Sequence, residues 1–180
     1  MAVIVTEVIT PQILTVLRTA NTLHWHGIHG VTHWQRVREN GLRLAQMNGA
    51  DALVVELFAF LHDIKRVNDG HDPQHGQRAA DFVRTLCWTR HGQCSEEPDR
   101  DGALIRLSDA QFEHLTYACA HHTEGLVEGP LTVRTCWDAD RLDLGRVGII
   151  PDPRRLCTAA ARDPDIRQWA IRRSQNHPSG

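Results

Sequence analysis

The hydrophobic residues of this chain recur mainly three or four positions apart, which is the spacing of one face of an α-helix. In one segment, for example, Trp34 and Val37 share a face while Arg36 lies opposite. Strand-like patterning is confined to two weak runs, at 3–5 and 104–107. The pattern therefore predicts an all-α fold, a compact helical bundle, with helices over 12–24, 31–47, 52–64, 73–88, 108–122, 132–144 and 164–174.

Residues that begin and end helices support these boundaries. Pro11 and Pro73 stand at first-turn positions, where proline fits a helix, and Asp51 and Ser108 can cap the helices that follow them. The segment 89–106 is rich in glycine, proline and charge and has no sustained period, so we expect a surface insertion there. Its mixed charge fits either a lid over a site or part of a homodimer contact.

Composition limits the function classes. The 180 residues and the hydrophobic fraction of 41% suit one domain with a substantial core. The 20 Lys and Arg residues nearly balance the 22 Asp and Glu residues, so no general positive field attracts nucleic acid or an anionic membrane. No run approaches the roughly 20 apolar residues of a membrane-spanning helix, and the first residues lack the features of a signal peptide. We therefore expect a cytoplasmic protein that binds neither membranes nor nucleic acid.

Cysteines and histidines differ in what they indicate. The five cysteines include no CxxC pair, which argues against a disulfide framework and against a four-sulfur zinc site. The 12 histidines are unusually many, and several of them stand beside aspartate or glycine. We therefore expect the functional residues of the chain to include several of its histidines.

The apolar helix 52–64 ends in an adjacent pair, His62 and Asp63. Burying an unpaired carboxylate is costly unless a cation or hydrogen bonds compensate for the lost hydration. Imidazole and carboxylate groups bind zinc, manganese and iron, and a mixed set of them leaves positions for water. Because adjacent helical residues point about 100° apart, this pair needs partners from other helices. His33 is one candidate, and spacing alone does not choose among the others, Asp138, Asp140 and Asp143.

Three motifs occur in a fixed order along the chain. They are His33-Trp34-Gln35-Arg36-Val37, then Leu61-His62-Asp63-Ile64, and then Ala139-Asp140-Arg141-Leu142. This ordered set resembles the HD superfamily of metal-dependent phosphohydrolases, over a core of about 24–148. The resemblance implies a single HD-type domain over 1–180, with the insertion at 89–106 and a C-terminal helical extension at 149–180.

The resemblance also implies a metal site. Its four ligand positions correspond to His33, His62, Asp63 and an aspartate of the third motif. The pattern Ala-Asp-x-Leu favours Asp140 for the last position, and Asp138 remains its substitute. The implied cofactor is a divalent metal ion, Mn, Zn, Fe, Co or Mg, present as one ion or two.

Some branches of the superfamily hold two metal ions and carry further histidines between the HD pair and the final aspartate. In this chain His75, His121 and His122 occupy that interval, and Asp63 would then bridge the ions. Two departures limit the transfer. The HDIG motif ends here in Lys65, and the HHExxxGxGYP signature of cyclic-dinucleotide phosphodiesterases is reduced to HHTEG, so we do not expect that substrate.

Roles beyond metal binding follow from charge and position. Arg66 and Lys65 come directly after the HD pair, where either can neutralise a substrate phosphate, although basic residues there also complement the helix dipole. His75 is a candidate general acid or ligand of a second ion. Only one residue of the pair His121 and His122 can face the site, and we expect it to be His121, as a substrate-binding residue.

Taken together, these features predict a phosphohydrolase that uses a metal-activated water. The expected substrate is a small phosphomonoester or phosphoanhydride, a nucleotide by family analogy. The catalytic residues are expected to be Asp63, Arg66 and His75. Two alternatives remain: a di-iron oxygenase of the HD type, favoured by the extra histidines, and a non-catalytic module that binds a metal ion and a nucleotide.

Overall fold

The computed structural model describes residues 8–89 and 105–175. The all-α fold is confirmed: the helices are α1 (Pro11–Ala20), α2 (Val31–Asn48), α3 (Ala52–Leu61), α4 (His75–Leu86), α5 (Asp109–His121), α6 (Leu131–Arg141), α7 (Ala159–Arg162) and α8 (Pro164–Gln175). Two 3-10 turns, η1 (Leu144–Val147) and η2 (Pro153–Arg155), follow α6. Two short strands, β1 (Cys87–Thr89) and β2 (Ile105–Leu107), pair in parallel with Cys87 opposite Ile105.

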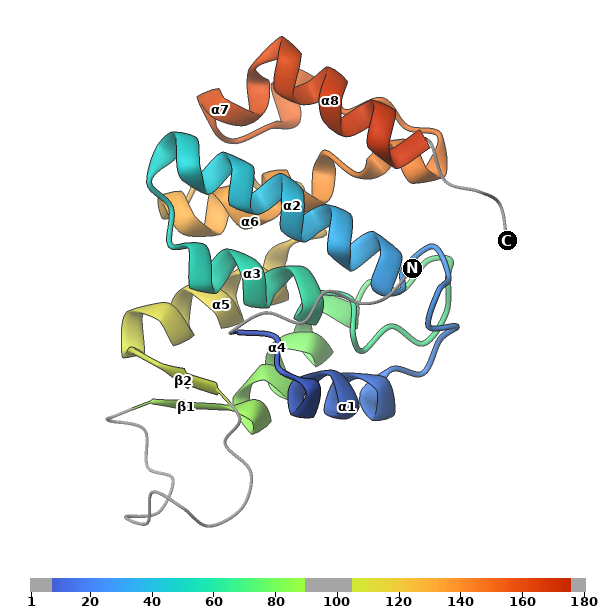
Figure 1. Ribbon diagram of the computed structural model, residues 1–180, viewed down its shortest axis with the longest axis vertical. Coiled ribbons are helices and arrows are strands. Elements are labelled where there is room, and N and C mark those ends of the chain that lie inside the picture. Colours follow the sequence, from blue (N-terminus) through green and yellow to red (C-terminus); the bar gives the residue numbers. More distant parts are fainter. Residues whose placement is uncertain (1–7, 90–104, 176–180) are drawn as a thin grey trace.

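The helix α3 lies at the centre of the bundle (Figure 1). It packs against α2, α5 and α6, and α4 packs against α5. Its side chains from Val54 to Leu61 are all buried, as the nearly continuous apolar run predicted. Because the end of α3 is enclosed, the two residues that follow it are buried too: His62 is 0% and Asp63 is 3% exposed. The fold therefore places an imidazole and a carboxylate inside the molecule.

Two glycines allow the close helix contacts that assemble this region. A Cβ atom on Gly41 of α2 would lie 2.4 Å from Cγ1 of Val55 on α3. A Cβ atom on Gly76 of α4 would lie 2.7 Å from the carbonyl oxygens of Cys119 and Ala120 on α5. Since such distances are too short for real Cβ atoms, larger residues there would push the helices apart. Gly76 in particular lets the start of α4 approach the end of α5.

Sequence signals account for several helix starts. Thr10 accepts a hydrogen bond from Ile13 N at the start of α1, and Asp51 accepts from Leu53 N and Val54 N at the start of α3. Ser108 forms a capping box with Gln111 at the start of α5. These side chains satisfy backbone N–H groups that have no partner within the helix.

Some boundaries differ from the predicted ones. The first helix ends at Ala20, because Asn21 has an extended backbone. The fourth helix ends at Leu86 instead of residue 88, because 87–89 pairs with 105–107 as a strand. The weak strand run at 104–107 thus corresponds to β2, whereas the run at 3–5 and most of the expected insertion, 90–104, lie outside the described residues. Within the described ranges, the helices lack the combined length and apolar character needed to span a bilayer.

Candidate metal centre

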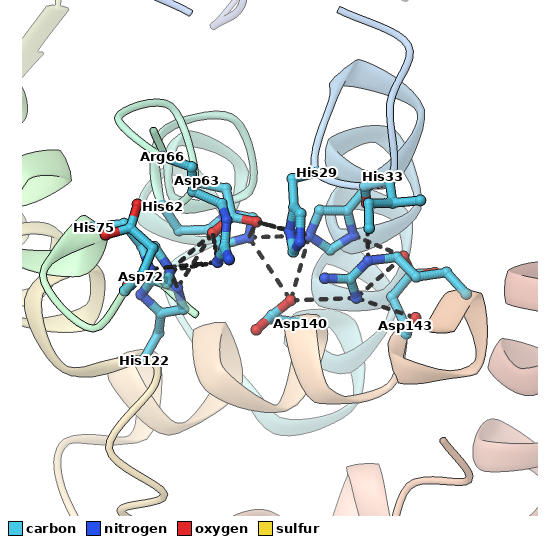
Figure 2. Close-up of polar contacts among 12 residues, drawn as sticks. His29, His33, His62, Asp63, Arg66, Asp72, His75, His122, Asp140 and Asp143 are labelled. Atoms are coloured by element: carbon cyan, nitrogen blue, oxygen red, sulfur yellow. Dashed lines mark hydrogen bonds and ion pairs between the residues drawn. The ribbon is translucent and has the colours of Figure 1, made fainter. Parts of the chain in front are cut away.

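Four imidazoles and two carboxylates point toward one another between the helices (Figure 2). They come from five helices or from the residues that directly follow them, and two of the six side chains follow α3. The imidazoles belong to His33 in the first turn of α2, His62 after α3, His75 at the start of α4 and His122 after α5; the carboxylates belong to Asp63 after α3 and Asp140 in α6. Helices far apart in the chain therefore build one polar cluster.

Hydrogen bonds to backbone carbonyl oxygens fix which nitrogen of three of the imidazoles faces the cluster. Nδ1 of His62 lies 3.1 Å from the Phe58 carbonyl oxygen, and Nδ1 of His122 lies 2.8 Å from that of Cys119. Nδ1 of His75 donates in the same way to the Asp72 carbonyl oxygen. Since a carbonyl oxygen only accepts hydrogen bonds, Nδ1 carries the proton and Nε2 is the nitrogen available to a metal ion. Such backbone anchoring is typical of metal-ligating histidines.

The first group of candidate ligand atoms contains Nε2 of His33 and Nε2 of His62, which lie 3.1 Å apart. Oδ1 of Asp140 lies 3.4 Å from the former and 3.7 Å from the latter. Oδ2 of Asp63 lies 3.7 Å from both. Ligand atoms bound to one ion through bonds of about 2.1 Å have separations in this range.

A second group lies on the other side of the Asp63 carboxylate. Nε2 of His75 and Nε2 of His122 are 2.9 Å apart, and Oδ1 of Asp63 lies 3.1 Å from the former and 3.5 Å from the latter. The two oxygens of Asp63 thus face the two groups. If each group held an ion, Asp63 would offer one oxygen to each of them.

Two observations show whether these residues fit the expected metal ion. Oδ1 of Asp140 is buried and has no hydrogen-bond partner among the described residues. Three sets of donors each lie within 4.8 Å of one another: His33 with His62 and Asp63, His62 with His122 and Asp140, and Asp63 with His75 and His122. A buried carboxylate oxygen without a partner, next to converging Nε2 atoms, needs a cation. The residues present fit a divalent metal ion.

Protonation states favour metal binding at the first group. Burial lowers the pKa of His62 to about 3, and burial together with Arg146 lowers the pKa of His33. Burial works to raise the pKa of Asp140, but His62 and Arg146 lower it to about 2. Burial also opposes ionisation of Asp63, yet His62 and hydrogen bonds from neighbouring imidazoles hold its pKa well below its usual range. Neutral imidazoles and ionised carboxylates are the forms that bind metal ions.

The second group differs from the first in the pKa of one of its histidines. Burial works to lower the pKa of His122, but its hydrogen bond to Asp63 and the charge of that carboxylate raise it. A proton on Nε2 of His122 therefore competes with an ion at that atom, and ion binding to the second group releases the proton.

Most of the expected ligands lie together, and the structure distinguishes the two aspartates. His33, His62, Asp63 and Asp140 form the first group, whereas Asp138 lies outside both. The Asp138 carboxylate accepts hydrogen bonds from Cys157 N at 2.7 Å and from Thr158 N and Oγ1 at 2.8 and 2.7 Å. Its oxygens are satisfied by the backbone that precedes α7. The geometry therefore favours Asp140 as the ligand and gives Asp138 a structural position.

Two expected substrate-binding residues point elsewhere. His121 is partly exposed and contacts Glu124, with Nδ1 2.9 Å from Oε1, so His122 faces the cluster in its place. Lys65 donates to the Ala20 carbonyl oxygen at 3.3 Å and lies over the Phe82 ring. The structure therefore does not bring these two residues to the cluster: the end of α5 turns His122 inward, and Lys65 joins α1 to the turn after α3.

Arg66 and His75 do lie at the cluster. Nη1 of Arg66 is 3.7 Å from Oδ1 of Asp63 and 3.1 Å from Nε2 of His75. The same guanidinium donates to the carbonyl oxygens of Asn68 and Gly70, which fixes its position. Arg66 therefore places a positive charge beside Asp63 and holds the turn that leads to α4.

Two residues of the centre were not among the expected site residues. Nδ1 of His29 lies 2.8 Å from Oδ2 of Asp63. Nη1 of Arg146, in η1, lies 4.0 Å from Oδ1 of Asp140. Neither residue belongs to a periodic pattern, but the four-residue spacing of His29 and His33 was a signal that both share one side of the chain.

A hollow of about 510 Å³ opens onto the cluster. Its lining includes Asp63, His75, His122 and Asp140 as well as Arg66 and Arg146. This volume lies within the roughly 300–1,000 Å³ that is typical of small-molecule sites. The candidate metal centre is thus accessible to a small ligand.

Comparisons with known proteins agree with this description at the level of the fold. No protein-family model and no curated protein matches the sequence. The structure is similar to the crystal structure of a predicted HD superfamily hydrolase from an uncultured Thermotogales bacterium, with a TM-score of 0.62. The two sequences are 23% identical, and the match covers 89% of this chain and 84% of that one. The chain therefore has the helical HD-domain fold that the order of its motifs indicated.

Proposed function

We propose that this protein is a metal-dependent phosphohydrolase that acts on a small phosphomonoester or phosphoanhydride, with nucleotides as the first substrates to test. One observation carries the proposal: the Nε2 atoms of four anchored imidazoles converge on two ionised carboxylates beside an open hollow. The neighbour's description as a predicted HD superfamily hydrolase supports the reaction class.

In this proposal His33, His62, Asp63 and Asp140 hold a first ion, and Asp63, His75 and His122 hold a second. A bound divalent ion polarises a phosphoryl oxygen and lowers the pKa of a coordinated water. The two sets of ligands share the carboxylate of Asp63. A substrate oxygen would therefore lie between the two ions. The position of Nε2 of His75, 3.1 Å from Oδ1 of Asp63, favours its role as a ligand over that of a general acid.

Two guanidinium groups supply positive charge where a phosphoryl group would lie. Arg66 and Arg146 line the hollow on the sides of Asp63 and Asp140, respectively. Charge-assisted hydrogen bonds from guanidinium groups to phosphate oxygens are about twice as strong as neutral ones. Donors held in place before the substrate arrives stabilise developing charge without reorganisation. Arg66 is held by the carbonyl oxygens of Asn68 and Gly70, as described above.

A di-iron oxygenase is a second candidate, and the nitrogen-rich second group favours it. His75 and His122 add two imidazole ligands to the bridging Asp63, and imidazoles suit iron as well as zinc or manganese. This function requires iron and O₂ and releases no phosphate. The same purified protein therefore distinguishes the two functions.

The test is elemental analysis of protein purified without chelator, followed by a phosphate-release screen over nucleotides and simple phosphomonoesters with Mn, Mg, Co, Zn and Fe. The Asp63→Asn variant removes the bridging charge and is expected to lose metal and activity. The matched control is Asp81→Asn, because Asp81 is an exposed aspartate on α4 that pairs only with Gln77 and Arg84 among the described residues.

Metal-dependent phosphate release that Asp63→Asn abolishes and Asp81→Asn retains would establish the hydrolase. Full activity of Asp63→Asn would contradict the proposal. Two irons per chain with O₂ consumption and no phosphate release would replace it with the oxygenase. Saturable nucleotide binding without any product would instead indicate a binding module.

A further inference from the structure

The hollow beside the candidate metal centre has two chemically different ends. At its inner end lie the carboxylates and imidazoles of the centre, with Arg66 and Arg146. Its outer wall is the segment 147–156, whose apolar lining residues are Ile149, Ile150, Pro151 and Leu156 and whose polar lining residues are Asp152 and Arg155. A ligand that fills the hollow therefore meets charge at one end and hydrocarbon at the other.

Two neighbouring isoleucines of this wall are unusually exposed. Ile149 is 52% and Ile150 is 69% exposed, whereas the core buries most other large aliphatic side chains. A single exposed apolar residue needs no explanation, but two in succession at the mouth of a charged hollow offer a binding surface. Hiding such a surface under an apolar group of a ligand is favourable, in proportion to the area removed from water.

The wall is held in place without a ligand. Arg141 donates to the carbonyl oxygens of Arg155 at 2.8 Å and Leu126 at 2.6 Å. Asp138 accepts hydrogen bonds from the backbone of Cys157 and Thr158 directly after the wall. Because these contacts order the backbone beforehand, a ligand binds without the entropic cost of ordering it.

The polar side chains of the wall are mostly engaged. Asp152 accepts hydrogen bonds from the backbone and side chain of Arg154, and Arg141 of α6, which also lines the hollow, is engaged as described. Arg155 lines the hollow and is exposed. The uninterrupted apolar part of the wall is therefore the run from Ile149 to Pro151.

Arg146 adds a donor for an anion at the inner end. Its Nε donates to the Ile28 carbonyl oxygen at 3.0 Å, and its Nη1 donates to the Asp143 carbonyl oxygen at 3.2 Å. Among the described residues, no hydrogen bond involves its Nη2. Since Arg146 lines the hollow, one N–H face of a fixed guanidinium is available to a phosphoryl oxygen.

We infer that the hollow binds a phosphomonoester whose organic group is apolar, and that Ile149 and Ile150 determine this specificity. This inference rests on the proposed function and names its substrate class. In the reaction, an oxygen of water forms a bond to phosphorus while the bond from phosphorus to the organic oxygen breaks. One proton of the water goes to the leaving oxygen, so that an alcohol or phenol and inorganic phosphate result. The phosphoryl group lies at the inner end and the organic group lies on the isoleucines.

The first experiment measures binding and needs no turnover. The full-length protein with Mn²⁺ is titrated by calorimetry with phenylphosphonate and with methylphosphonate, which share the phosphonate group and differ in apolar area. We expect phenylphosphonate to bind about tenfold more tightly. In the variant Ile149→Asn/Ile150→Asn this preference is expected to fall to about twofold. Both positions are exposed, so the variant is expected to fold, which its melting curve verifies.

The control is Val147→Asn, since Val147 is 42% exposed in the same segment but is not among the residues that line the hollow. It is expected to keep the full preference. Equal binding of the two phosphonates to the unsubstituted protein, or an unchanged preference in the double variant, would overturn the inference. A dimer in sedimentation that the double variant alone dissociates would also overturn it, because the isoleucines would then belong to an interface.

A second experiment separates this inference from the proposed function. Hydrolysis of p-nitrophenyl phosphate and of glycerol 2-phosphate is compared by kcat/KM for the same three proteins. A preference for the aromatic ester that only the double variant loses supports the inference. If phenylphosphonate binds preferentially but neither ester is hydrolysed, the apolar subsite stands and the hydrolase proposal fails. If both esters are hydrolysed equally well, the hydrolase stands and the inference fails.

Discussion

Nδ1 of His33 lies 2.7 Å from Oδ2 of Asp143, and Arg36 donates two hydrogen bonds to the same carboxylate. Burial works to raise the pKa of Asp143, but the hydrogen bond and charge of His33 and then those of Arg36 lower it. The carboxylate is therefore ionised, holds the proton of His33 on Nδ1 and directs Nε2 toward His62. Asp143 is thus placed to position the candidate ligand His33 without being a candidate ligand itself.

This relationship predicts the effect of Asp143→Asn. The amide has nearly the same shape but no charge, so it holds the His33 ring less firmly and makes Nε2 of His33 a weaker metal ligand. We expect metal affinity to fall about 10- to 100-fold, the range observed when such outer partners are removed. Titration of metal-free protein with Mn²⁺ or Zn²⁺ measures the effect, with Asp81→Asn as the control. Affinity within twofold of the unsubstituted protein would contradict the role.

Adjacent histidines at the end of α5 provide a matched pair of variants. His122 is 5% exposed and lies in the second group of ligand atoms, whereas His121 contacts Glu124 at the surface. We expect His122→Ala to remove the second ion and leave the first, which elemental analysis after dialysis would show as a drop from two ions per chain to one. His121→Ala is expected to change nothing. Loss of an ion in His121→Ala alone would refute this assignment.

The parts of the centre that could be predicted from sequence are those with a local cause. The apolar run of α3 implies burial, and burial makes an adjacent His62 and Asp63 costly without a cation. His33 was found because its motif stands at a helix start. The bundle was predicted for the same reason, since helical periodicity and capping residues act over a few positions.

The rest depends on contacts between distant segments. Asp138 and Asp140 are two residues apart, so they point about 200° apart on α6, and only the packing of α6 decides which one faces the centre. Similarly, the close approach of α4 and α5 at Gly76 turns His122 toward His75. No local pattern contains that information. Arg146 was missed because η1 is too short to show a period.

The structural position of Asp138 gives a third prediction. Its two oxygens accept three hydrogen bonds from Cys157 and Thr158, and an amide at this position brings one NH₂ group against an N–H or O–H donor. An unsatisfied buried polar group costs about 1–3 kcal/mol. Asp138→Asn is therefore expected to lower Tm by roughly 2 to 12 °C in a domain of this size. Elemental analysis is expected to show unchanged metal content, and loss of metal without loss of stability would instead make Asp138 a ligand.

Asp72 gives a prediction about pH, because it joins the turn after α3 to α4. Its carboxylate accepts two hydrogen bonds from Nη2 of Arg78, at 2.7 and 2.6 Å, and one from Val67 N at 2.9 Å. Burial works to raise the pKa of Asp72, but these partners lower it. A carboxyl group whose pKa is lowered on folding adds stability above its unfolded pKa of about 3.9, and that stability is lost as pH falls through the folded value.

Replacing Asp72 with Asn removes the charge and retains the shape. At pH 7 we expect Asp72→Asn to lower the free energy of unfolding by about 1 to 2 kcal/mol, which is roughly 2 to 8 °C in Tm. The difference between the two proteins is expected to shrink as pH falls below about 4, because the carboxyl of the unsubstituted protein then takes up a proton. Melting curves between pH 3 and pH 7 measure it. A difference in Tm that stays constant over this range would show that the shape of the side chain, and not its charge, stabilises the turn.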